Sequence, residues 1–154
     1  GMDAGRVLDV PGHTIGHIAF HFPASRAAFT ADSLMSCGCG RLFEGTADQM
    51  WASLSQFMAM PPDTLICSGH EYTLANIRFA LSVDPDNSTL QQRATAAEAL
   101  RARGLPTLPV TLAEELATNP FLRAANPAFR AALGLADLDA AQAFAHLRKL
   151  KDRF

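Results

Sequence analysis

The chain has 154 residues, of which 49% are apolar and 18% are charged, and its net charge is -2. This composition supports one packed domain, with or without a small appendage, and excludes a largely disordered chain. The near-neutral charge gives no support for nucleic-acid binding. No apolar run reaches the roughly 20 residues that cross a bilayer, so no membrane contact is expected. The three cysteines, with no secretory signal in view, favour a reduced, cytoplasmic setting.

The first 83 residues alternate between short β-favouring runs, loops and helical stretches. The runs are bounded by Gly, Pro or Ser and predict strands at 6–10, 18–22, 27–31 and 64–68. Between the last two runs, Thr46 and Gln49 form a capping-box signature, which predicts a helix that the proline pair at 61–62 ends.

A second helix is expected after His70, and Leu74, Ile77 and Leu81 have the spacing of its buried stripe. Residues 84–154 are rich in Ala, Leu and Arg, lack β-branched runs and are predicted to be helical throughout.

Four helices are predicted in this second region, and their expected starts are Ser88, Thr111, Asn126 and the vicinity of Asp137. Gly104 and Gly134 mark two of the expected helix ends. The predicted fold class is therefore α/β (α+β). An α/β unit at 1–83 is followed by a small all-α subdomain at 84–154.

The stretch PGHTIGHIAFHF places histidines at 13, 17 and 21, the spacing of one helix face. A helix is nevertheless disfavoured, because Gly12 and Gly16 flank the first two histidines and IAFHF favours a strand. On a strand, His21 lies on the face opposite Phe20, and we interpret it as an ordinary surface or helix-covered histidine.

His13, Asp32 and His70 each follow a predicted strand and are candidate metal ligands. A lone loop histidine most often bonds nearby backbone, so His13 carries little weight by itself. Three N and O ligands at the ends of different strands can converge on one edge of a sheet, and zinc or a similar ion suits such a set. An aspartate can also bridge two ions through its two oxygens, which makes Asp32 the candidate catalytic carboxylate.

The cysteines are weaker candidates for zinc ligands than His13, Asp32 and His70. Cys37 and Cys39 are separated by one residue, which is a poor match to the knuckle spacing of structural zinc sites. Buried packing is the favoured role for these two and for Cys67.

Five ordered segments resemble one known family, glyoxalase II (hydroxyacylglutathione hydrolase) of the metallo-β-lactamase superfamily. They are PGHTIGHIAF, FTADSL, GCGRLFEGTADQMW, CSGHEYTLANIRFA and LPVTLAEELATNPFLR. The family hydrolyses the thiolester S-lactoylglutathione in methylglyoxal detoxification. The resemblance implies the C-terminal half of an αββα sandwich followed by the family's helical subdomain.

The resemblance also implies roles for individual residues. His13 would be a ligand of the first metal, Asp32 the bridge and His70 a ligand of the second, while His17 would not be a ligand. The metal would be zinc, iron or manganese. The glutathione moiety would be held by residues corresponding to Arg41, Phe43, Tyr72, Arg148 and Lys151, with Phe43 standing where some members have a tyrosine.

One departure from the family is large. The upstream motif T-H-x-H-x-D-H, which supplies four further ligands, has no counterpart, because no H-x-H occurs in the sequence. We therefore expect a partial or weak metal site and little or no activity from this chain alone. The apolar face of its sheet would be covered by a second copy or by a separately encoded N-terminal half. The alternative is a non-catalytic glutathione-binding or dimerising remnant.

Overall fold

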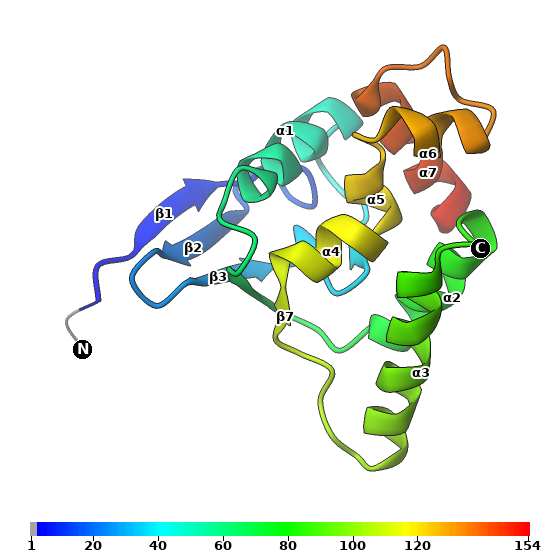
Figure 1. Ribbon diagram of the computed structural model, residues 1–154. Coiled ribbons are helices and arrows are strands. Elements are labelled where there is room, and N and C mark those ends of the chain that lie inside the picture. Colours follow the sequence, from blue (N-terminus) through cyan, green and yellow to red (C-terminus); the bar gives the residue numbers. More distant parts are fainter. Residues whose placement is uncertain (1–2) are drawn as a thin grey trace.

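The structure, a computed structural model, describes residues 3–154 (Figure 1). Its strands are β1 (Arg6–Asp9), β2 (Ile18–Phe22), β3 (Ala27–Ala31), β4 (Leu34–Met35), β5 (Gly38–Cys39), β6 (Leu65–Ser68) and β7 (Val110–Thr111). Its helices are α1 (Ala47–Met58), α2 (Thr73–Val83), α3 (Ser88–Ala102), α4 (Leu112–Thr118), α5 (Pro120–Arg123), α6 (Pro127–Ala132) and α7 (Ala140–Asp152). The α/β class is confirmed. Within residues 3–154 no helix is both long and apolar enough to cross a membrane.

Strands β1, β2, β3, β6 and β7 form one mixed sheet in that order. The β3–β6 pair is parallel, and the other neighbours are antiparallel. Strands β4 and β5 form a separate hairpin between β3 and α1. Because β1 and β3 both run antiparallel to β2, strands β1, β3 and β6 all point the same way, and their C-terminal ends meet at one edge.

The two faces of the sheet differ sharply in burial. Side chains alternate between faces along each strand, and Ala19, Ala28 and Ile66 on one face are fully buried in the core. That core also contains Met50 and Phe57 from α1. In Figure 1, α1 lies on this side of β1, β2 and β3. His21 shares the covered face, since Ala28 is its partner in register.

The opposite face is apolar and bare in the described part of the chain. Its exposed side chains are Val7 (63%), Ile18 (41%), Phe20 (42%), Phe29 (49%) and Leu65 (38%). Val7, Phe20 and Phe29 stand side by side across three strands. Contiguous apolar patches on a soluble domain usually mark a contact surface, and this face matches the one that the sequence predicts to need a cover.

Most predicted helices are present, with local corrections. The capping box of Thr46 and Gln49 is confirmed, but α1 ends at Met58, before the prolines. In α2, Ile77 is buried as predicted, whereas Leu74 and Leu81 are only partly buried. The fully covered positions include Phe79, which packs against Phe121 of α5.

The region predicted to be entirely helical contains a strand. Val110 and Thr111 form β7, which pairs with β6 through Ile66 and Leu65. The prediction failed because two residues are too few to show a periodic pattern. Val110 and Thr111 are extended because they pair with β6. Helix α5 was also missed, since its proline start and four residues give no helical period. The division into 1–83 and 84–154 stays a prediction.

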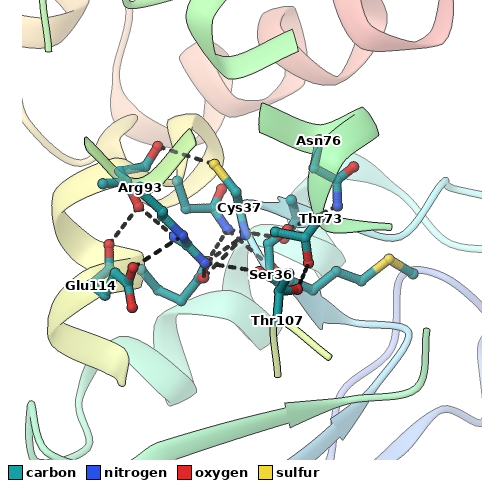
Figure 2. A network of polar contacts seen from close by, with 12 residues as sticks. Ser36, Cys37, Thr73, Asn76, Arg93, Thr107 and Glu114 are labelled. Atoms are coloured by element: carbon teal, nitrogen blue, oxygen red, sulfur yellow. Dashed lines mark hydrogen bonds and ion pairs between the residues drawn. The ribbon is translucent and has the colours of Figure 1, made fainter. Parts of the chain in front are cut away.

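A buried polar network ties the helical region to the β4–β5 hairpin (Figure 2). The Glu115 carboxylate, fully buried, accepts from the Cys37 backbone N–H at 3.0 Å, from Asn119 Nδ2 at 2.7 Å, and from the Arg93 guanidinium. Arg93 also donates to Ser36 Oγ at 2.9 Å. Cys37 has a φ of +54°, a conformation that is unfavourable for a residue with a side chain. The network therefore holds a strained turn in place.

Replacing Glu115 with alanine is expected to destabilise the fold by about 3–5 kcal/mol, because it leaves the buried Arg93 charge and the Cys37 N–H without their acceptor. Urea denaturation of the folded chain measures this loss. Glu114→Ala is the matched control: its side chain is 39% exposed and meets Arg93 Nε only at 3.4 Å, so a cost below about 1 kcal/mol is expected. Equal unfolding midpoints for the two variants would contradict the assignment.

Candidate active site

Three chemistry-bearing residues meet where β1, β3 and β6 end. His13 lies in the loop after β1, Asp32 directly follows β3, and His70 follows β6. The shared direction of these strands brings the loops to the same edge of the sheet. The structure thus places together the three residues that the sequence predicts as metal ligands.

Asp32 stands between the two histidines. Its Oδ2 is 3.7 Å from His13 Nε2, and its Oδ1 is 3.3 Å from His70 Nε2. Each carboxylate oxygen therefore faces a different ring. Asp32 Oδ1 is also buried and has no hydrogen-bond partner among the described residues. An orphaned buried carboxylate oxygen is costly, and a cation at this point would satisfy it.

The orientation of His13 follows from one hydrogen bond. Its Nδ1 is 2.8 Å from the backbone carbonyl of Arg41, and because a carbonyl can only accept, Nδ1 carries the proton. In the neutral ring, the lone pair then lies on Nε2, the atom that faces Asp32. This arrangement, with one ring nitrogen bonded to backbone and the other free, is typical of metal-binding histidines. A hydrogen bond to nearby backbone is what an ordinary loop histidine makes, but in His13 it leaves Nε2 free. His13 can therefore still be a metal ligand.

His17 is oriented differently and is not available as a ligand. Its Nε2 accepts the backbone N–H of Asp32 at 3.1 Å, and its Nδ1 lies 3.3 Å from Thr14 Oγ1. Burial lowers the pKa of His17, His13 acts in the same direction, and Asp32 opposes them. A neutral ring is the form that can accept from the Asp32 N–H. His17 thus positions the Asp32 backbone.

The backbone around Asp32 is tightly constrained. Ala31 has a φ of +46°, where glycine is favoured, so the sequence accepts strain at the residue that aims Asp32. A Cβ on Gly40 would lie 2.2 Å from the Asp32 carbonyl oxygen and 2.9 Å from His13 Nδ1. Only glycine therefore allows the chain after β5 to pass this close.

The residues fit a metal ion in chemistry but do not form a complete cage. Within residues 3–154, no three His, Cys, Asp or Glu side chains already stand in the arrangement of a full metal site. Two ligands bonded at about 2.0–2.1 Å in a tetrahedral site lie about 3.3 Å apart, and His70 Nε2 and Asp32 Oδ1 have this separation. Imidazole nitrogen and carboxylate oxygen also suit zinc, iron and manganese.

A cavity of about 690 Å³ extends from this edge. It is lined by every residue that the sequence analysis assigned to a site: His13, Asp32, Arg41, Phe43, His70, Tyr72, Arg148 and Lys151. The aromatic rings flank the histidines: Phe43 lies 4.9 Å from His13, and Tyr72 is stacked on His70 at 4.9 Å between ring centroids. The candidate metal edge and the predicted ligand site are thus one continuous space.

The two predicted cations of α7 differ in their freedom. Arg148 is almost fully buried, donates to the Cys39 carbonyl at 3.0 Å and to Asp152 at 2.9 Å, and stacks over Phe121. It is therefore first a structural link between α7 and the hairpin. Lys151 is half-buried with its Nζ over the Phe79 ring. Its pKa is lowered first by burial and then by the nearby cations Arg148 and Arg41.

The cysteines play no part at the metal edge. Burial raises the pKa of the Cys37 thiol to about 12 and that of the Cys39 thiol to about 11. Both are buried, as predicted, whereas Cys67 is only partly buried. Unreactive buried thiols of this kind serve packing.

Some cavity residues were missed from the sequence. Arg78 and Asn76 of α2, together with Phe154 at the chain's end, line the same space. Arg78 follows Tyr72 and Ala75 at three-residue spacing, which is the signal that could have placed it on the cavity side of the helix.

The fold is that of the metallo-β-lactamase class. Residues 1–70 match the family model described as the metallo-beta-lactamase superfamily, which implies metal ions at the site, and residues 71–154 match "Hydroxyacylglutathione hydrolase C-terminus". The second match covers more than half of the chain, and the chain therefore belongs to the hydroxyacylglutathione hydrolase family.

Curated relatives agree with this assignment, and a solved structure shares the fold. A hydroxyacylglutathione hydrolase of Ruegeria pomeroyi is 62% identical over 96% of this chain and 58% of its own length. One from Cereibacter sphaeroides is 55% identical over the whole chain and 60% of its own length. The chain thus spans about three-fifths of these relatives. The crystal structure of ETHE1 from Myxococcus xanthus shares the fold, with a TM-score of 0.58 at 23% identity, over 97% of this chain and 46% of that one.

Replacing His17 with alanine is expected to weaken zinc binding about 10–100-fold, because the Asp32 backbone loses its only described acceptor. Competition against a chromogenic chelator measures the affinity. His21→Ala is the control, since this histidine lies further along β2 and makes no contact with Asp32 that the structure describes. Wild-type zinc affinity in the His17 variant would contradict the positioning role.

Proposed function

We propose that this chain provides the substrate cavity and part of the metal centre of a thiolester hydrolase that cleaves S-lactoylglutathione-type substrates to glutathione and a 2-hydroxy acid. The observation that carries the proposal is the position of Asp32. Its two oxygens face His13 and His70 at one end of a cavity that also contains Arg41, Tyr72 and Lys151. The three partly or fully buried thiols support a reduced, cytoplasmic setting.

Each side chain has a defined task in this proposal. His13 presents the lone pair of Nε2, His70 directs its Nε2 to Asp32, and Asp32 presents one oxygen to each side, so these three would hold zinc, iron or manganese. The chemistry supplied by metal ions bound in such sites is the activation of water and the stabilisation of negative charge on the carbonyl oxygen. Arg41 and Lys151 attract the carboxylates of glutathione. Tyr72 and Phe43 provide aromatic walls beside the reacting end.

The chain alone is expected to hydrolyse thiolesters poorly or not at all. A catalytic zinc ion is usually held by three protein ligands. Three ligands shared between two metal positions therefore leave each ion with too few protein donors. The alternative function is therefore a glutathione-binding or dimerising remnant without catalysis. The bare sheet face favours some form of assembly under both functions.

We propose that, in isolation, the face formed by Val7, Ile18, Phe20, Phe29 and Leu65 packs against the same face of a second copy. None of these five side chains is charged, so the contact would bury mainly apolar surface. Asp9, which pairs with Ile18, lies on the same face at the end of β1 and would sit at the margin of the contact. The remaining two-fifths of the relatives' length would supply the natural cover, either preceding this sequence or separately encoded. That partner would compete with the homodimer for one surface.

A complementation assay tests both proposals. The chain is mixed with the part of the Ruegeria pomeroyi relative that lies outside the match, and zinc is added. Hydrolysis of S-lactoylglutathione is expected from the mixture and not from either piece, and Asp32→Asn is expected to abolish it. Asp63→Asn, an exposed residue paired with Arg26 on the surface, is the matched control and should retain the activity.

Light scattering follows the assembly in the same experiment. The chain alone is expected to have the mass of a dimer, and adding the complementary piece should convert it to a one-to-one complex. A stable monomer at micromolar concentration would contradict sheet-to-sheet dimerisation. A stable one-to-one complex, fully loaded with metal but without hydrolysis, would favour the non-catalytic alternative.

A further inference from the structure

The cavity has an excess of positive charge that its own residues do not neutralise. Its charged lining consists of the cations Arg41, Arg78, Arg148 and Lys151 and a single carboxylate, Asp32. Asp32 faces the two histidines at the metal edge. Because Asp152 pairs with Arg148, the charges of Arg41, Arg78 and Lys151 are available to a ligand with more than one negative group.

Arg78 and Arg41 are the two cations of this set whose guanidinium groups have no described partner, and only Arg78 was not assigned to the site from the sequence. Arg148 is occupied by the Cys39 carbonyl and Asp152, and Lys151 lies over Phe79. Arg78 is exposed, lines the cavity and has no ion pair or hydrogen bond within residues 3–154. A guanidinium fork on a cavity wall is well suited to a carboxylate.

The position of Arg78 along α2 places it far from the reacting end. Tyr72, at the start of the helix, is stacked on His70, and Arg78 lies six residues further on, or about 9 Å along the axis. Arg41 is close to the reacting end instead, because its backbone carbonyl bonds His13. The cavity therefore offers a near and a far anion-binding position.

We propose that Arg78 determines specificity by binding the α-carboxylate of the γ-glutamyl arm of glutathione. This inference rests on the proposed function and names a subsite within it. The sulfur lies in the middle residue of the tripeptide, and the γ-glutamyl arm is longer than the glycine arm. With the sulfur near Asp32, the glycine carboxylate reaches Arg41 and the γ-glutamyl carboxylate reaches Arg78.

Calorimetric titration of the full chain with three thiols tests the subsite. The probes are glutathione, γ-glutamylcysteine, which lacks the glycine arm, and cysteinylglycine, which lacks the γ-glutamyl arm. Arg78→Gln is compared with Arg103→Gln, which removes the same charge from an exposed position at the end of α3. The ratio of the dissociation constants for the two variants is measured for each probe.

Arg78→Gln is expected to weaken glutathione and γ-glutamylcysteine by about threefold to fivefold, the range of a well-placed exposed ion pair. Cysteinylglycine should bind both variants equally. Identical glutathione affinity in the two variants, or an equal loss with cysteinylglycine, would overturn the assignment of Arg78 and leave the proposed function intact. Failure of the wild-type chain to bind glutathione would overturn the proposed substrate class and the subsite together.

Discussion

The common direction of β1, β3 and β6 is the constraint on which the site depends. Because these strands end at one edge of the sheet, loops that are far apart in sequence deliver His13, Asp32 and His70 to a single point. The loops themselves are held by short-range contacts. Gly40 allows the close approach of the chain after β5, and His17 fixes the Asp32 backbone.

The β4–β5 hairpin connects this edge to the helical region. On one side, it leads from Asp32 to Arg41, and on the other it receives Arg148 of α7 and Glu115 of α4. Burying the Arg93–Glu115 ion pair has a high desolvation cost. The same two side chains make the hydrogen bonds to Cys37 and Ser36 that hold the hairpin turn in place. The helical region thus shapes the cavity wall as well as covering the core.

Local chemistry made much of this structure predictable. Strand and helix positions followed from periodicity and caps, such as the Thr46–Gln49 capping box, and the ligand candidates followed from polar residues placed just after strands. The features that the sequence did not predict depend on tertiary contacts. β7 is a strand only because β6 is beside it, and the structural role of Arg148 depends on a carbonyl more than a hundred residues away. Arg78 was missed because its only signal, the three-residue spacing from Tyr72 and Ala75, becomes useful once Tyr72 is known to line a cavity.

We infer that Asp32, His13 and His70 form part of a metal centre whose other ligands lie outside this chain. Equilibrium dialysis against zinc, followed by elemental analysis, measures it most directly on the isolated chain and on the complex with the complementary piece. We expect at most one weakly held ion per isolated chain, lost in Asp32→Asn, and close to two ions per complex. Two tightly bound ions on the isolated chain, or zinc binding that survives the loss of Asp32, would contradict it.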